Sequence, residues 1–352
     1  MADPRKWMIY GATGYTGRLV AQEARRQGLS PILGGRTEAV ASLAAEFGLT
    51  SRVFSLTDVA ATRRAIDGIS VVAHCAGPFA ATSAPMIDAC LLARAHYVDI
   101  TGEIDVFVAA QRRHQAAKAA GIVICPGVGF DVIPTDCVAA CLQEALPDAT
   151  HLALGFKTVS ARSPGTARTA IEGARFGARV RANGAIVSEP LGRRTRTIDF
   201  GTGPKRAVAI PWGDVATAYF TTGIANIEVY VPASPRSLAR LHRLNRLRPL
   251  LHLPAVRALL GRIAARNSPG PSERARESEK ARVWGEARNE RGDTRTAYLT
   301  TSNGYRLTVD GVLMAVRALL ARAPAGGYFT PVQLMGARCV ERLPGCSAIL
   351  VE

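Results

Sequence analysis

A glycine-rich turn near the start of the chain constrains the fold more than any other feature. The stretch WMIYGATGYTGRLV contains Gly11, Gly14 and Gly17 at GxxGxxG spacing, directly after the apolar run 7–10. Where such a turn joins a strand to a helix, the first glycine permits the tight turn and the second lets the backbone approach a pyrophosphate. The third allows the helix and strand to pack closely. The helix N-terminus then offers free N–H groups to the phosphates. The turn therefore predicts a dinucleotide-binding unit, with a purely structural turn as the alternative.

The first 130 residues alternate between short apolar segments and helix-like segments. This alternation predicts parallel strands joined by helical crossovers, and hence an α/β fold with a doubly wound parallel sheet of the Rossmann type. We place this domain at residues 1–130, with a single long helix expected over 104–121. The expected strands lie at 6–12, 30–36, 51–56, 69–78, 96–102 and 122–127.

The pattern changes after Gly129, where several segments rich in Thr, Val and Ile follow one another. They predict a second α/β domain, with a mixed or antiparallel sheet, over residues 131–324. A helix is expected over 163–180, and a hairpin is expected around Arg291–Asp293.

The chain has a formal net charge of +16, and one segment concentrates this excess. Between Arg236 and Arg266, eight arginines are interleaved with leucines and no acidic residue occurs. A basic helical segment of this kind, here 235–266, can lie on an anionic membrane or bind an acidic carrier protein. The alternative is an ordinary amphipathic helix with solvated arginines. Nucleic acid is not an expected partner, because no aromatic platform or recognition motif accompanies the charge.

The remaining bulk features predict a cytoplasmic protein, with association at a membrane surface left open. No apolar run is long enough to span a bilayer, and no apolar segment of signal-peptide length precedes the glycine turn. Seven cysteines without CxxC spacing predict reduced, mostly buried thiols. The six histidines form no metal-binding pattern, so no metal site is expected. Homo-oligomerisation stays open.

The tip of the second expected strand indicates which dinucleotide binds. An acid at this position typically holds the 2′-hydroxyl of NAD, whereas an arginine suits the 2′-phosphate of NADP. The tip is Gly34-Gly35-Arg36, and no acid occurs before Glu38. We therefore expect NADP(H). The alternative for Arg36 is a solvated surface arginine.

The fourth expected strand ends in the small, turn-forming loop Ala76-Gly77-Pro78. Because the carboxyl ends of the strands border the cofactor crevice, this loop is expected to contact the nicotinamide ribose. His74 and Cys75 lie directly before this loop. We expect them to pack in the core or to contact residues that line the site, without contacting the substrate themselves. None of the eight tyrosines has a lysine four residues later, which argues against a short-chain dehydrogenase.

The motifs GATGYTGRLV, LGGR, VVAHCAGPF, HYVDITGE and CPGVGFDVIPTD occur in an order that resembles the saccharopine-dehydrogenase-like oxidoreductases. Later segments, among them PWGDVATAYFTTGIANIEVY and TPVQLMG, resemble the branch that includes bacterial trans-acting enoyl reductases. The resemblance implies a Rossmann domain rejoined by the C-terminal tail, here 325–352, and an inserted α/β domain. It implies cofactor contacts at Gly11, Thr13, Gly14, Tyr15, Thr16, Gly17, Arg36, Ala76, Gly77 and Pro78.

The expected activity is NADPH-dependent hydride transfer to the C=C bond of an enoyl substrate of lipid or polyketide type, free or bound to a carrier. Reduction of a C=N bond, as in saccharopine-type imines, and a non-catalytic NADP-binding regulator are the alternatives. Tyr219 and Asp99 are the candidate proton carriers. Thr101 is placed with the cofactor contacts, although Thr101 or Glu103 could equally cap the next helix. The other candidates near the substrate are Asp131, Trp212 and Asp214, whereas Asp136 is expected to be a helix cap.

Overall fold

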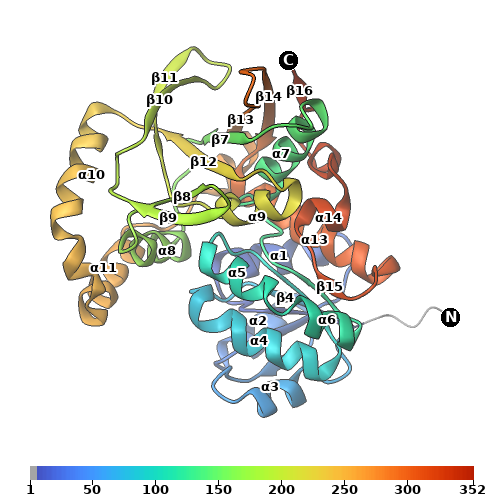
Figure 1. Cartoon of the computed structure of the whole chain (residues 1–352). Coiled ribbons are helices and arrows are strands. Elements are labelled where there is room, and N and C mark those ends of the chain that lie inside the picture. Colours follow the sequence, from blue (N-terminus) through green and yellow to red (C-terminus); the bar gives the residue numbers. More distant parts are fainter. Residues whose placement is uncertain (1–5) are drawn as a thin grey trace. The chain divides into compact units, whose positions relative to one another are not determined.

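The computed structural model describes residues 6–352, which form two compact units. Of the described residues, the first unit contains 6–101, 105–130 and 307–335. The second contains residues 102–104, 131–306 and 336–352. The chain therefore crosses between the units several times, and each unit has a sheet of its own (Figure 1).

The first unit is built on a seven-stranded sheet in the order β15-β6-β5-β4-β1-β2-β3, in which every pairing is parallel. The order places β1 between β2 and β4, as in a Rossmann fold. The α/β fold and its doubly wound parallel sheet are therefore confirmed. The strands are β1 Trp7–Tyr10, β2 Ile32–Gly35, β3 Ser51–Val53, β4 Val71–His74, β5 His96–Asp99, β6 Val123–Cys125 and β15 Gly327–Tyr328.

The central strands β1 and β4 are buried along their whole length, which explains their continuous apolar sequences. The long helix expected over 104–121 is instead two helices, interrupted at Arg112 and Arg113. The helices that belong wholly or mostly to this unit are α1 Tyr15–Arg26, α2 Ala39–Phe47, α3 Val59–Ala65, α4 Phe79–Ala93, α5 Ile104–Gln111, α6 His114–Ala120, α13 Gly304–Arg322 and α14 Pro331–Met335.

The second unit has a nine-stranded mixed sheet, as expected. Its main path runs β10-β11-β12-β7-β13-β14-β16, and β8 pairs with β12 and with β9. The β12–β7 pairing is parallel, while its other pairings are antiparallel. The strands are β7 His151–Lys157, β8 Ala178–Ala182, β9 Ala185–Glu189, β10 Thr195–Asp199, β11 Pro204–Ala209, β12 Asn226–Pro232, β13 Lys280–Arg288, β14 Thr294–Ser302 and β16 Leu350–Val351.

The expected hairpin around Arg291–Asp293 is present as β13 and β14. The helix expected over 163–180 ends at Ala174, because Gly177 has a φ of 75° and the chain then enters β8. The helices of this unit are α7 Ile133–Ala145, α8 Pro164–Ala174, α9 Asp214–Thr222, α10 Pro235–Leu247, α11 Pro254–Arg266 and α12 Glu273–Ser278, with short 3₁₀ helices at Arg248–His252 and Cys339–Arg342.

The expectation for the C-terminal tail 325–352 needs correction. Its first part, up to Met335, belongs to the first unit and contributes the edge strand β15. Residues 336–352 belong to the second unit instead, because Leu350 and Val351 pair with Tyr298 and Ala297 of β14. The backbone hydrogen bonds of this last strand extend the mixed sheet of the second unit.

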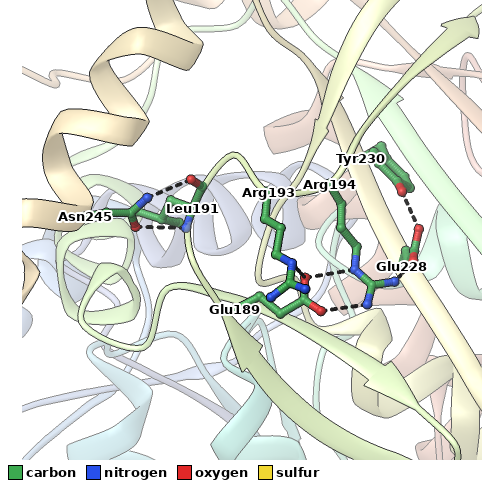
Figure 2. A network of polar contacts seen from close by, with 7 residues as sticks. All are labelled: Glu189, Leu191, Arg193, Arg194, Glu228, Tyr230 and Asn245. Atoms are coloured by element: carbon green, nitrogen blue, oxygen red, sulfur yellow. Dashed lines mark hydrogen bonds and ion pairs between the residues drawn. The ribbon is translucent and has the colours of Figure 1, made fainter.

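A polar network fastens the loop after β9 to its surroundings within the second unit (Figure 2). Arg194 donates to both carboxylate oxygens of Glu189, at 2.8 and 2.6 Å, and also contacts Glu228. The side-chain amide of Asn245, on α10, pairs with the backbone N–H and C=O of Leu191 at 2.9 and 2.8 Å. The network therefore attaches α10 to the sheet through a specific pair of hydrogen bonds.

No helix within residues 6–352 combines the length and the apolar character needed to cross a bilayer.

Candidate functional site

The glycine turn between β1 and α1 has a geometry that only glycine permits. Gly11 has a φ of 84°, and its N–H donates to the carbonyl of Gly34 at 2.9 Å. The N–H of Gly14 donates to the carbonyl of Gly11 at 3.0 Å and closes the turn. A Cβ atom on Gly17 would lie 2.3 Å from that same carbonyl oxygen. The turn and the helix thus touch through bare backbone, as a dinucleotide-binding turn requires.

The N-terminus of α1 is open toward a ligand. Its N-cap is Gly14, no side chain caps it, and its first turn contains no acid. Thr13 and Gly14 are exposed, while Tyr15 and Thr16 are half-buried. Backbone N–H groups and the positive end of the helix dipole are therefore available for a pyrophosphate. The residues of this turn suit the dinucleotide that the sequence predicts.

Arg36 supplies a positive charge at the carboxyl end of β2. The side chain is exposed and makes no ion pair with any residue between 6 and 352. Burial raises the pKa of the Tyr10 hydroxyl, and the charge of Arg36 opposes this rise in pKa. Arg36 is therefore close to the central strand, where a guanidinium is placed for a 2′-phosphate.

The loop Ala76-Gly77-Pro78 lies directly against the glycine turn. A Cβ atom on Gly11 would come within 2.8 Å of the Cβ and backbone nitrogen of Ala76. Thr82 Oγ1 donates to the carbonyl of Ala76 at 2.6 Å and holds the loop, while Gly77 and Pro78 stay exposed. The structure thus brings two of the expected cofactor segments together at one edge of the sheet.

His74 and Cys75 are placed for packing, not for chemistry. The His74 imidazole is fully buried, with its ring centroid 5.6 Å from that of Tyr10 and 5.5 Å from that of Phe79. Burial lowers the pKa of His74 to about 3, so the ring is neutral at physiological pH. Burial also raises the pKa of the Cys75 thiol to about 12, and the Asp99 charge adds to this effect. Neither group is available as an acid or a nucleophile near neutral pH.

Asp99 and Thr101 occupy interior positions that differ from their expected roles. The Asp99 carboxylate is 1% exposed and accepts hydrogen bonds from Tyr97 Oη at 2.7 Å and from the N–H groups of Thr101 and Gly127 at 3.0 and 2.9 Å. Thr101 is completely buried. Oδ1 of Asp99 joins two loops and Oδ2 bonds Tyr97 of the same strand, so the carboxylate holds the local structure together and does not suit the expected role of proton carrier. Thr101 likewise offers no exposed group to a cofactor.

Tyr219, the other candidate proton carrier, belongs to α9 in the second unit. It is half-buried, and the Arg181 guanidinium carbon lies 3.9 Å from its ring centroid. Arg181 is 6% exposed, and it donates from Nε to the carbonyl of Val215 at 2.8 Å and from Nη1 to that of Gly184 at 2.5 Å. No carboxylate between residues 6 and 352 pairs with it. Arg181 was not predictable from the sequence. β8 contains two arginines, Arg179 and Arg181, and nothing in the sequence of this strand indicates that Arg181 is the buried one.

Several buried polar groups lie near the start of α9. Asp214 is fully buried, and burial raises its pKa well above the ordinary value, while the Thr135 hydroxyl opposes this rise. The indole N–H of Trp212 and the Thr217 hydroxyl are also buried without a hydrogen-bond partner in the described chain. These unsatisfied polar groups make this region a candidate contact for substrate or ordered water.

Asp136 is not the helix cap that was expected. α7 begins at Ile133, so the side chain of Asp136 lies inside the first turn, where it is fully buried and accepts a hydrogen bond from Thr221 Oγ1 at 2.6 Å. The helix N-terminus still favours its negative charge. The other candidates are Glu103 and Asp131, which are both half-buried. Among residues 6–352, no cluster of histidines, cysteines and acids is suited to a metal ion.

The geometry of the first unit defines a dinucleotide-binding Rossmann domain. Residues 7–125 match the family described as "Saccharopine dehydrogenase NADP binding domain". This segment of the first unit is therefore similar to that family, in agreement with the resemblance in the sequence motifs. The expected cofactor, NADP(H), is the one that the family description names.

Two curated relatives match the chain over part of its length. A trans-acting enoyl reductase of Mycobacterium leprae is 32% identical over 139 residues, which are 37% of this chain and 33% of the relative. The human saccharopine dehydrogenase-like oxidoreductase is 28% identical over 156 residues, which are 38% of this chain and 36% of the relative. The matched regions thus span about a third of each relative.

The likeness in fold extends further than the likeness in sequence. The apo saccharopine dehydrogenase (L-Glu forming) of Saccharomyces cerevisiae superposes with a TM-score of 0.62, and the alignment covers 99% of both chains. Only 12% of the aligned residues are identical. This similarity establishes the fold alone, including a second domain of the same kind.

Proposed function

We propose that the protein is an NADPH-dependent reductase that transfers hydride to the C=C bond of an enoyl substrate with an acyl chain of lipid or polyketide type. The observation that carries the proposal is the open glycine turn, with Arg36 beside it at the end of β2. The similarity to a trans-acting enoyl reductase supports a C=C bond as the target. When bound, NADPH supplies the hydride, and the protein supplies orientation and a proton.

Each segment of the first unit has a distinct task in this proposal. The backbone from Gly11 to Gly17 and the N-terminus of α1 hold the pyrophosphate, because they expose N–H groups without a side chain in the way. Arg36 holds the 2′-phosphate. The loop Ala76-Gly77-Pro78 contacts the nicotinamide ribose and limits where the ring can lie.

Tyr219 is the proposed proton donor of the second unit. Its phenol makes no hydrogen bond within the described chain, so the hydroxyl is free for a substrate. The Arg181 guanidinium over the ring fixes the orientation of the Tyr219 side chain. A tyrosine in this setting can protonate the carbon that becomes electron-rich after hydride transfer.

A second candidate function is the reduction of a C=N bond in an imine that carries a carboxylate. Arg181 favours this alternative, because a buried guanidinium without an acidic partner is suited to an anionic group of a ligand. The human relative with a saccharopine dehydrogenase-like name also supports it.

A substrate panel with deuterated NADPH distinguishes these activities. The protein is incubated with enoyl thioesters and with cyclic imines, and mass spectrometry locates the transferred deuterium. We expect deuterium on the β-carbon of an enoyl product, with a lower rate for Tyr219→Phe. Deuterium only in an amine product would favour the alternative. NADPH binding without transfer to either class would instead favour a non-catalytic NADP-binding regulator.

Arg36→Gln tests the cofactor assignment directly. Loss of a charged hydrogen bond to the 2′-phosphate should raise the Kd for NADPH by about 10- to 100-fold, while the Kd for NADH changes little. Arg25→Gln is a matched control, because Arg25 is exposed on α1 and the charge change is the same. Fluorescence titration measures both constants. An equal loss of affinity for both cofactors would exclude the 2′-phosphate role of Arg36.

A further inference from the structure

The exposed apolar side chains of this protein are concentrated in one segment. Among the described residues, ten large apolar side chains are exposed, and six of these lie between Leu247 and Ile263. Exposed apolar side chains that are concentrated in this way generally mark a contact with another molecule or a membrane. The six residues are Leu247, Leu250, Leu253, Leu259, Leu260 and Ile263.

The helix α11 has an inverted distribution of apolar residues. Its Gly261 and Ala265 are buried, and the helix packs on α8, where Arg257 pairs with Glu172 at 2.9 Å. The leucines at 259 and 260 and Ile263 face outward, with exposures of 58, 36 and 47%. An ordinary surface helix buries its large apolar residues and exposes its polar ones. Here the small residues face the protein, which leaves the large ones for a partner.

Positive charge surrounds these side chains. No acidic residue occurs from 229 to 272, whereas eight arginines lie between Arg236 and Arg266. Six of these arginines are exposed and make no ion pair with any described residue. They are Arg236, Arg240, Arg243, Arg246, Arg262 and Arg266. The surface therefore attracts an anionic partner and has no acids of its own to oppose it.

The folded second unit holds this segment in place. Asn245 ties α10 to the backbone of Leu191 (Figure 2). Arg257 ties α11 to α8 through Glu172. Figure 1 shows α10 and α11 along one edge of the second unit. The exposed residues thus belong to an ordered surface.

We propose that the basic apolar face, defined by the six apolar residues of 247–263 and the six exposed arginines, binds the surface of an anionic lipid bilayer. The exposed leucines and Ile263 can enter the acyl boundary, while the exposed arginines contact headgroup phosphates. A protein interface would typically gather its apolar and aromatic residues in a core with a polar rim. Residues 233–266 contain no aromatic residue and no methionine. The proposal does not depend on the activity proposed above.

Vesicle flotation with the full-length protein tests this inference. We expect it to float with phosphatidylcholine vesicles that contain phosphatidylglycerol, and not with phosphatidylcholine alone. Raising the salt from about 0.05 M to about 0.5 M should release a large part of the bound protein, because screening weakens the contacts between the arginines and the headgroups. The triple variant L259S/L260S/I263S should bind at least about tenfold more weakly.

The matched control is the triple variant L92S/V159S/L350S, which removes three exposed apolar side chains elsewhere. It should bind the anionic vesicles like the unmodified protein. Arg262→Gln with Arg266→Gln should also weaken binding, whereas Arg63→Gln with Arg64→Gln, both exposed on α3, should not. Thermal melts of each variant are needed to establish that it is folded.

Three outcomes would overturn the inference. They are equal flotation with neutral and anionic vesicles, an equal loss of binding in the two triple variants, and no flotation at all. In the last case, retention of the protein on immobilised poly-glutamate would indicate that an acidic protein occupies this face instead of a membrane.

Discussion

Gly17 shows how strongly one missing side chain can determine a binding site. A Cβ atom there would lie 2.3 Å from the carbonyl oxygen of Gly11, so either the turn or α1 would have to move. The sequence spacing predicted this close approach, because dinucleotide-binding turns need it at the third glycine. The structure adds that the clash is with backbone, which cannot rotate away as a side chain can.

Gly17→Ala should therefore abolish measurable NADPH binding and lower the free energy of unfolding by about 2 kcal/mol or more. Isothermal titration calorimetry and chemical denaturation measure the two effects. Gly173→Ala is the control, since a Cβ at Gly173 of α8 meets no atom within 4 Å. That change should leave stability the same or raise it by about 0.5–1 kcal/mol. Normal NADPH affinity in Gly17→Ala would contradict the tight turn.

His74 should make the first unit sensitive to mild acid. Its pKa is about 3 in the folded protein, below the ordinary value near 6.5, so the unfolded chain binds the proton first as the pH falls. The stabilising contribution is complete above about pH 6.5 and decreases below it by up to about 1.4 kcal/mol per pH unit. Between pH 6.5 and 5, the free energy of unfolding should fall by about 2 kcal/mol.

His74→Phe tests this pH dependence, because it keeps the aromatic contacts with Tyr10 and Phe79 but cannot be protonated. Urea denaturation at several pH values should give a flatter profile for the variant between pH 6.5 and 5. An identical slope in both proteins would show that other groups cause the acid sensitivity.

The parts of the candidate site that are formed by backbone turns were predictable from the sequence. The burial of individual side chains was not. The glycine turn and the Ala76 loop follow from local sequence patterns. The interior position of Asp99 was not predictable, because a carboxylate at the end of a strand can point to solvent or bond to neighbouring loops. The interior position of Asp136, in the first turn of α7, was not predictable either. Arg181 gave no signal, since its burial and its stacking on Tyr219 depend on how β8 packs beside α9.

At the scale of elements, the side chain of Asn245 joins α10 to the loop after β9 by two hydrogen bonds. Asn245 accepts a hydrogen bond from the Leu191 N–H and donates one to the Leu191 carbonyl. An amide side chain can satisfy a backbone donor and acceptor at once, which an ionised carboxylate cannot do because it has no donor. Leu191 is itself buried, so these backbone groups have little access to water as a substitute.

Asn245→Ala should lower the free energy of unfolding by about 1–3 kcal/mol, because two backbone groups lose their partners. Hydrogen exchange should become faster in α10 and around Leu191, and stay unchanged in β13 and β14. Asn267→Ala is the control, since Asn267 is exposed at the end of α11 and its side chain makes no bond within the described chain. Equal exchange in both variants would show that the pair does not hold α10.

Most elements of both sheets were predictable from alternation and glycine positions, and the exceptions have physical causes. The single helix expected over 104–121 is broken at Arg112, within the polar run 111–115. The tail was expected to return to the first unit as a whole. Its last strand joins β14 instead, because an edge strand can add a neighbour through backbone hydrogen bonds that leave little trace in the sequence.

At the scale of the whole molecule, the cofactor and the basic apolar face belong to different units. The glycine turn lies in the first unit, and the segment 247–263 lies in the second. The proposed cofactor contacts, Arg36 and the open helix N-terminus, lie within the first unit, so the proposal does not require the net charge of +16. Cofactor binding should consequently stabilise the first unit without depending on the arginines of α10 and α11.

NADPH should raise the stability of the first unit by mass action, because only the folded glycine turn binds it. At a free concentration of about 100 times the Kd, the added stability is about 2.7 kcal/mol. Hydrogen exchange with and without NADPH can locate the effect, which should be greatest in β1, α1 and β4. NADH at the same concentration should protect these elements less, since Arg36 has no 2′-phosphate to bind.

The double variant R262Q/R266Q should show the same protection by NADPH as the unmodified protein. Protection that depends on those arginines would mean that the dinucleotide binds to the basic apolar face and not to the Rossmann unit.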